Sequence, residues 1–152
     1  TLEKKDTLVE ETLVKAINGI LAPMEKKNIE LTVNCRSGMA VSHDSRWTSE
    51  ALFNLLDNAV KYTPPGGSIH VSVQNWEMYL KIDVSDTGRG IPEREQAAIF
   101  KRFYREEAVR EVDGIGIGLY LAREIITMQG GYIWVTSQVG KGSTFSVFLP
   151  RG

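Results

Sequence analysis

Apolar side chains recur along the chain with two different periods, and the period separates the expected helices from the expected strands. Apolar positions recur about every 3.6 residues at 7–27, with Pro23 as a kink or break, and again at 45–62, which predicts two helices. Apolar and polar residues alternate in shorter segments, which predicts strands at 29–33, 39–41, 69–73, 78–84, 133–136 and 144–149. We expect the first two of these strands to form a small hairpin.

Glycine and proline mark where these elements end. The two prolines and two glycines at 64–67 end the second helix, and residues 75–77 separate two strands that should pair antiparallel. A short helix is expected at 93–103 and is followed by a charged stretch without a core pattern, up to Asp113. The glycines within 114–118 then open a helix that runs to Met128. This layout is a mostly antiparallel sheet covered by helices.

Composition narrows the class of protein. The 152 residues are 42% hydrophobic, enough for one core and too few for two ordinary domains. A formal net charge of -1 is too small to attract the whole domain electrostatically to nucleic acid or membrane, so we expect contact with neither. The lone cysteine, Cys35, fits a reducing, cytoplasmic setting. Because the chain opens at Thr1 without methionine, we expect a fragment of a longer protein, whose anchoring in the inner membrane is left open.

The helix at 45–62 presents polar side chains on one face. Asn54, Asn58, Lys61 and Tyr62 are spaced by about one and two helical turns, so they project from a narrow sector. Two amide oxygens can complete the oxygen shell of a Mg2+ ion whose other ligands are phosphates and water, and Lys61 can meet a phosphate. The alternative is an ordinary solvated face of an amphipathic helix.

A carboxylate and two glycines follow directly after the strand at 78–84. Asp86 stands at the strand end, with Gly88 and Gly90 where the backbone must come close to another group. A carboxylate accepts a hydrogen bond from the exocyclic amino group of adenine, whereas guanine presents a carbonyl oxygen there. The alternative is a plain Asp-x-Gly turn.

A third motif is the glycine repeat at 114–118. Free amide groups and the positive end of the following helix can receive phosphate oxygens there. A charged segment precedes the repeat, which excludes a dinucleotide fingerprint, and residues 140–144 lack the residue order of a P-loop.

Taken in order, these motifs resemble those of sensor histidine kinases, in the ATPase superfamily shared with gyrase, MutL and a heat-shock chaperone. Asn54-Leu-Leu-Asp-Asn58-Ala-Val-Lys61-Tyr62-Thr-Pro looks like the N box, and Asp86-Thr-Gly88-Arg-Gly90 resembles the G1 box. The F box, the G2 box and the last Gly-Thr box are matched by residues 99–105, 114–119 and 140–145. The resemblance implies an α+β fold: a two-layer α/β sandwich, its mostly antiparallel mixed sheet covered on one face by about three helices, with an ATP lid between the F and G2 boxes. It covers residues 7–152, which leaves residues 1–6 as the end of a linker from an upstream helical domain.

The resemblance also implies roles for single residues. ATP and Mg2+ would be bound with Asn58 as the metal ligand, Asn54 beside it, Lys61 on a phosphate, Tyr62 as a wall and Asp86 as the adenine reader. The other positions that the family pattern places at the nucleotide are Gly88, Gly90, Ile91, Gly116, Ile117, Gly118, Leu119 and Thr144. Arg102 and Arg105 are candidates with undecided roles, Phe100 and Phe103 are expected to anchor the base of the lid, and residues 106–113 are expected to be its mobile part.

The reaction type depends on Asn54, because hydrolysing relatives usually carry a water-orienting glutamate there. Glu50 could substitute only from one turn earlier, and a solvated glutamate is the simpler interpretation. His43 lies in a sequence that superficially resembles a phosphoacceptor box, but it precedes the N box and lacks the expected proline. His70 lies in a predicted strand, so we expect no phosphoacceptor in this chain.

The resemblance therefore implies the catalytic half of a two-component kinase. This half would be a monomer that passes the γ-phosphoryl group of ATP to a histidine on the phosphoacceptor helical domain of a homodimeric parent, which then serves a response regulator. The alternatives are a nucleotide-binding regulatory module without transfer activity and an ATPase clamp related to MutL.

Overall fold

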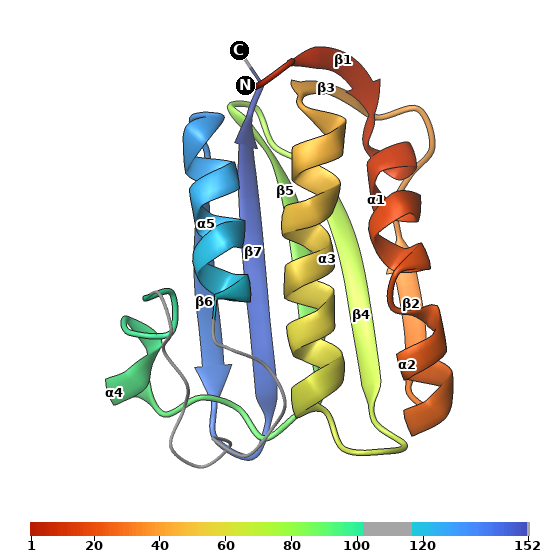
Figure 1. Ribbon diagram of the computed structural model, residues 1–152, viewed down its shortest axis with the longest axis vertical. Coiled ribbons are helices and arrows are strands. Elements are labelled where there is room, and N and C mark those ends of the chain that lie inside the picture. The colour runs from red at the N-terminus through yellow and green to blue at the C-terminus, as the bar shows by residue number, and fades with distance from the viewer. Residues whose placement is uncertain (102–116, 152) are drawn as a thin grey trace.

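A five-stranded sheet, covered by helices on one face, forms the body of the protein (Figure 1). The computed structural model describes residues 1–101 and 117–151. The helices are α1 (Val9–Asn18), α2 (Leu21–Lys27), α3 (Ser45–Tyr62), α4 (Glu93–Gln96) and α5 (Gly118–Met128). The strands are β1 (Lys5–Leu8), β2 (Glu30–Asn34), β3 (Ala40–His43), β4 (Ser68–Asn75), β5 (Tyr79–Asp86), β6 (Tyr132–Gln138) and β7 (Gly142–Pro150). No helix in these described ranges is long and apolar enough to cross a membrane.

The main sheet is mixed and mostly antiparallel, with strand order β2-β4-β5-β7-β6. Only β2 and β4 pair in parallel, and the remaining neighbours are antiparallel. Helices α1, α2, α3 and α5 lie over the same face (Figure 1), which confirms the two-layer α+β fold.

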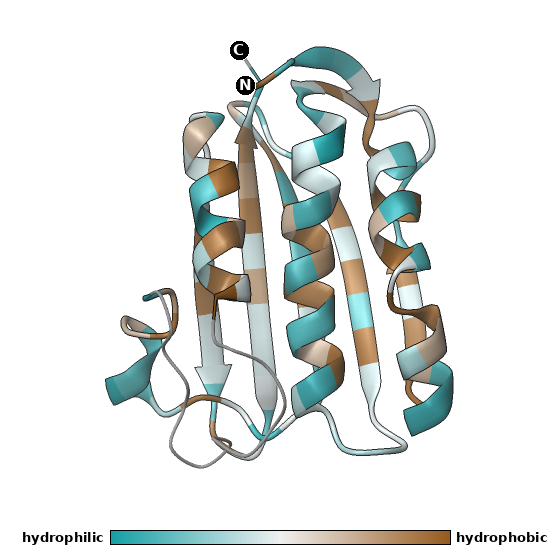
Figure 2. Cartoon of the chain, in the orientation of Figure 1, coloured by the Kyte–Doolittle hydropathy of each residue, from teal (hydrophilic) through white to brown (hydrophobic). Residues whose placement is uncertain are grey.

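The core lies between this face and the helices. Helix α3 runs over the middle of the sheet and buries the apolar stripe that the sequence predicts, with Leu52, Leu55 and Leu56 fully buried. The strands alternate between buried and more exposed positions, as the bands along β4 in Figure 2 illustrate. Because α3 is fixed by its buried side, its polar face has a defined direction at the end of the sheet.

Two expectations about the N-terminal third are wrong. The strands at 29–33 and 39–41 do not form a hairpin: β2 pairs in parallel with β4, and β3 pairs antiparallel with β1. Alternation identifies a strand but not its partner, and here both partners come from distant sequence. The helical segment expected at 7–27 is interrupted away from Pro23, and it begins within β1 and continues as two helices.

The break between α1 and α2 lies at Gly19 and Ile20 rather than at Pro23. A Cβ at Gly19 would stand 2.8 Å from the ring of Phe53, and Ile20 is fully buried, so packing against α3 sets the break. Pro23 is the third residue of α2, in the first turn, where a missing N–H is tolerated. Strand β1 starts at Lys5, within the segment expected to be linker, and the linker boundary stays a prediction.

Helix α4 ends at Gln96, earlier than expected from the pattern at 93–103. The next residues turn, so that Ile99 and Phe100 enter the core, where the ring of Phe100 meets that of Phe145 edge-on at 6.0 Å. Burial of Phe100 agrees with the expected anchoring role. Phe103 and the expected mobile segment 106–113 lie outside the described residues.

Candidate functional site

The polar face of α3 supplies the first part of the site. Asn54, Asn58, Lys61 and Tyr62 occupy the last three turns of the helix, and all four are half-buried. The first residue of α5, Gly118, lies against Asn54, since a Cβ built there would be 3.8 Å from Asn54 Oδ1. The structure therefore brings the N-box helix and the start of α5 together, as the sequence predicts.

The side-chain amide nitrogen of Asn54, Nδ2, is buried without a hydrogen-bond acceptor among the described residues. A buried amide without a partner costs about 1–3 kcal/mol, so a fold normally retains one only where it has another use. A polar ligand between α3 and α5 would supply the missing acceptor, so the residue fits a nucleotide site.

Lys61 does not point freely toward a ligand in this structure. Its ammonium group lies 3.1 Å from a carboxylate oxygen of Asp57, four residues earlier on the helix. Both side chains are about one-third exposed, so solvent screens the pair and its contribution is small. Lys61 can therefore exchange Asp57 for a phosphate at little cost.

Asp86 provides a carboxylate near the end of α3, after strand β5. It is the last residue of β5, and its Oδ1 accepts a hydrogen bond of 2.9 Å from the backbone N–H of Gly88. Burial raises the pKa of Asp86, while the backbone N–H groups of Gly88 and Ser143 partly offset this by stabilising the charged form. A carboxylate has about four acceptor positions, so it can still accept from a ligand amino group.

The glycines after Asp86 let three backbone segments meet. A Cβ at Gly88 would stand 2.5 Å from the carbonyl oxygen of Tyr62, so only glycine lets this turn lie against the end of α3. Gly90 has φ +77°, and a Cβ there would overlap the carbonyl of Gln138 in the β6–β7 turn. Both glycines thus have a packing role, and their contact with a nucleotide stays a prediction.

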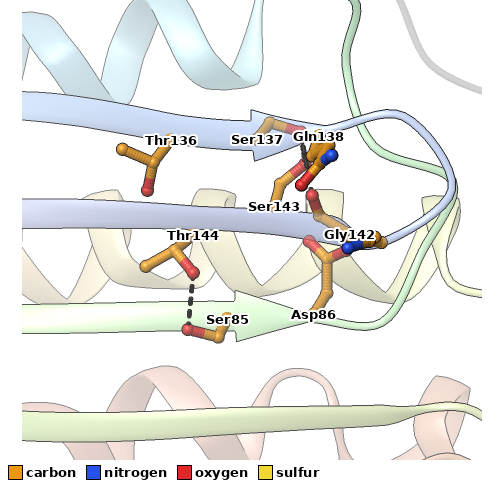
Figure 3. Close-up of a pocket in the computed structure, with 9 residues that line it drawn as sticks. Ser85, Asp86, Thr136, Ser137, Gln138, Gly142, Ser143 and Thr144 are labelled. Atoms are coloured by element: carbon orange, nitrogen blue, oxygen red, sulfur yellow. Dashed lines mark hydrogen bonds between the residues drawn. The ribbon is translucent and has the colours of Figure 1, made fainter.

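Thr144 lines the same open pocket as Asp86, but from the neighbouring residue pair of the sheet. Its hydroxyl lies 2.8 Å from that of Ser85, its partner on β5 (Figure 3). This pair is next to the pair of Asp86 and Ser143, so the side chains of the two pairs lie on opposite faces of the sheet. The residue paired with Asp86 on β7 is Ser143, whose row continues to Ser137 on β6. A nucleotide contact from Thr144 stays a prediction.

Ser143 and Ser137 are candidate site residues that the sequence motifs did not single out. Phe145 faces the buried core, so alternation along the strand places Ser143 on the same face and Thr144 on the other. That signal was present in the sequence. An open pocket of about 450 Å³ lies at these strand ends, and its lining includes Asp86, Ser137 and Ser143 as well as Ser85 and Thr144 (Figure 3).

The remaining expected site residues divide into two groups. Ile117 and Leu119 flank the first residue of α5 and are half-buried, and Ile91 continues the turn after Asp86. Arg102, Arg105 and Gly116 lie outside the described residues.

The described geometry suits one kind of ligand. Two carboxamides and an ammonium line α3, and a half-buried carboxylate faces the same end of the sheet. Hard amide oxygens suit Mg2+ shared with phosphate oxygens, and the carboxylate suits an amino group on a flat base.

Comparison with known proteins gives relatives of one kind. The adaptive-response sensory kinase SasA of Thermosynechococcus vestitus (strain NIES-2133 / IAM M-273 / BP-1) is 51% identical over 102 residues, covering 66% of this chain and 27% of that protein. The sensor protein DivL of Caulobacter vibrioides is 35% identical over 151 residues, covering 99% of this chain and 19% of that protein. The chain thus spans about a quarter or less of the length of these relatives.

Solved structures agree with the fold. The mycobacterial sensor histidine kinase MprB superposes with a TM-score of 0.84 at 25% identity, covering 97% of each chain. The catalytic domain of histidine kinase ThkA superposes with a TM-score of 0.85 at 24% identity, covering 98% of this chain and 97% of that one. A family model described as histidine kinase-, DNA gyrase B- and HSP90-like ATPase matches residues 43–152. Because that match covers well over half of the sequence, the chain belongs to the family of histidine kinase-, DNA gyrase B- and HSP90-like ATPases.

Proposed function

We propose that this domain binds ATP with Mg2+ and delivers the γ-phosphoryl group to a histidine on a separate phosphoacceptor domain of a longer protein. The observation that carries the proposal is the meeting of α3, the Asp86 turn and the start of α5 at one end of the sheet. Family membership and the sensor kinases among the relatives support it.

Each part of the site has a task in this proposal. Asp86 accepts a hydrogen bond from the adenine amino group, Tyr62 walls the pocket, and Lys61 leaves Asp57 to contact a phosphate. Asn58 and Asn54 would hold Mg2+, which supplies charge neutralisation on the phosphate oxygens. The N–H groups at the start of α5 would receive oxygens of the same anionic group.

The transfer itself needs little covalent help from the domain. A ring nitrogen of the acceptor histidine attacks the γ-phosphorus, the bond from that phosphorus to the bridging oxygen breaks, and ADP leaves with the electron pair. The acceptor imidazole loses its proton to solvent. The domain contributes positioning and charge stabilisation.

The two histidines of the chain support a separate acceptor. His43 is 1% exposed, and both of its ring nitrogens are hydrogen-bonded, Nδ1 to the Val41 carbonyl and Nε2 to the Thr12 hydroxyl. His70 is exposed on β4 and hydrogen-bonded through Nδ1 to the Thr32 hydroxyl. Neither lies on the polar face of α3.

Asn54 favours transfer over hydrolysis, because an amide cannot act as a base toward water. Glu50 is exposed on α3, one turn earlier, so it gives no support to a water-activating role. A structure of ThkA in complex with the response regulator TrrA is among the similar folds, and we propose a response regulator as the downstream partner of the longer protein here.

Radiolabel transfer tests the proposal. The domain, mixed with the phosphoacceptor domain of its longer protein and ATP labelled at the γ-phosphate, should label the acceptor through an acid-labile, alkali-stable bond. Labelling should be slow, because the two domains are not tethered. Label on His43 of the domain itself, or rapid phosphate release without the acceptor, would reject transfer in favour of a self-contained enzyme. Nucleotide binding without labelling would favour a regulatory module.

A further inference from the structure

The hydroxyl group of Ser137 lies at the end of β6, beside the turn that carries Asp86. Ser137 pairs with Ser143 on β7, and Ser143 pairs with Asp86 on β5, so the three residues form one row across the sheet. Figure 3 shows Ser137, Ser143 and Asp86 gathered at the strand ends. The sequence motifs assign no function to Ser137.

Three groups form hydrogen bonds with this one hydroxyl. The backbone N–H of Ile91 lies 2.7 Å from Ser137 Oγ, the carbonyl oxygen of Gly142 lies at 2.9 Å, and the hydroxyl of Ser143 lies at 2.7 Å. A serine hydroxyl offers one donor and two acceptor positions. Since Ile91 can only donate and Gly142 can only accept, the Ser143 hydroxyl must donate to Ser137. This assignment uses the whole hydrogen-bonding capacity of Ser137.

These partners belong to the two turns that hold Asp86. Ile91 ends the turn that starts at Asp86, whereas Gly142 and Ser143 begin β7. The backbone N–H of Gly88 donates to the Asp86 carboxylate at 2.9 Å, and the backbone N–H of Ser143 also stabilises its charged form and so lowers its pKa. Ser137 is thus linked to Asp86 through Ser143 on one side and through the turn that ends at Ile91 on the other.

Further hydrogen bonds join the two turns to each other. The N–H of Gly140 donates to the carbonyl of Arg89 at 2.7 Å, which joins the β6–β7 turn to the Asp86 turn. The amide of Gln96 donates to the carbonyls of Ile91 at 3.0 Å and Ser137 at 3.2 Å. Without the Ser137 hydroxyl, the Ile91 N–H and the Gly142 carbonyl would each lose a hydrogen bond, and the turns would have to shift or admit water.

We propose that Ser137 is a positioning residue that fixes the direction of the Asp86 carboxylate and thereby sets the preference for adenine over guanine nucleotides. The inference rests on the proposed function, because it takes Asp86 as the adenine reader. Ser137 touches no ligand in this role. A small rotation of the carboxylate weakens its bond to the adenine amino group and does not improve the fit to guanine.

Nucleotide selectivity is the measurement that a general packing role would not change. Dissociation constants for ATP and GTP with Mg2+, measured by calorimetry or competition with a fluorescent nucleotide, give the ratio for each variant. Ser137→Ala should weaken ATP binding roughly tenfold and lower the ATP/GTP ratio by a similar factor. Ser137→Thr keeps the hydroxyl and should restore most of the ratio.

A matched control removes a different hydroxyl from the same sheet. Ser146 on β7 donates to the Asp83 carboxylate at 2.5 Å and is as buried as Ser143, so Ser146→Ala deletes a comparable bond away from the two turns. It should leave the ATP/GTP ratio unchanged. If Ser137→Ala does not fold, Ser137→Cys gives the same test, because a thiol is a weak donor and acceptor.

Asp86→Asn separates failure of this inference from failure of the proposed function. If Asp86→Asn abolishes selectivity while Ser137→Ala and Ser137→Cys keep the native ratio, the positioning role is overturned and the adenine-reader role stands. If Asp86→Asn itself keeps the ratio, the reader role and the inference both fail. A ratio that falls equally in Ser137→Thr would also overturn the inference, because the hydroxyl would then not be the cause.

Discussion

Replacing Asn54 with alanine should stabilise the empty domain while weakening its response to nucleotide. The substitution removes a buried amide nitrogen that has no partner among the described residues, which is worth about 1 kcal/mol or more. It also exchanges a poor helix former for the best one inside α3, a gain of about 0.6 kcal/mol. Against this stands the loss of the packing of the amide group near the start of α5, where a Cβ added at Gly118 would come within 4 Å of it, about 0.5 kcal/mol in all. The net expectation is a gain of about 1 kcal/mol.

Urea or thermal unfolding without nucleotide measures this gain. For a domain of this size, about 1 kcal/mol corresponds to a rise in Tm of roughly 2–4 °C. With saturating Mg2+ and a non-hydrolysable ATP analogue, the native domain should be more stable than Asn54→Ala, because bound ligand stabilises the native site more than the altered one. Such a crossing would mark Asn54 as a residue kept for function at a cost in stability.

Asn58→Ala is the matched control for this experiment. It makes the same exchange one turn later on α3, so it shares the gain in helix propensity, and its stability in the absence of nucleotide should rise less than that of Asn54→Ala. It should also lose most of the Mg2+-dependent gain in nucleotide affinity. The reasoning fails if Asn54→Ala is less stable than the native domain without nucleotide, since the amide would then be satisfied in solution.

Two further predictions concern stability. In urea unfolding, Gly90→Ala should destabilise the domain by at least about 2 kcal/mol more than Gly140→Ala does. Both glycines have positive φ, but only a Cβ at position 90 would overlap the carbonyl of Gln138. Equal losses of stability would contradict this packing role. Burial lowers the pKa of His43, so as the pH falls the unfolded chain takes up a proton near pH 6.5 before the folded one does. The free energy of unfolding should therefore fall below about pH 6.5. The loss should reach up to about 1.4 kcal/mol per pH unit until the folded pKa is reached. His43→Gln should flatten this dependence and His70→Gln should keep it; a slope that survives in His43→Gln would refute the assignment.

Local periodicity by itself determined most of the elements. The helix expected at 45–62 has those bounds in the structure, the strands at 69–73 and 78–84 pair antiparallel as predicted, and strands form near 133–136 and 144–149. These segments are long or strongly alternating, and their buried faces coincide with the apolar pattern. The motifs carried by the same segments were enough to indicate the family, because the spacing of Asn54, Asn58 and Lys61 is a property of a single helix.

Tertiary structure decided what depends on contacts between distant segments. The sequence predicts a strand at 29–33 but not its pairing with β4, because a strand edge accepts any neighbour that the connections allow. The break between α1 and α2 follows from Gly19 meeting Phe53, which no local pattern contains. Likewise, Ser137 becomes part of the site only where β6, β7 and the Asp86 turn meet, because its hydroxyl is satisfied by groups from two other segments. Periodicity fixes which face of an element is buried, whereas the identity of the neighbour across that face is set by packing of the whole chain.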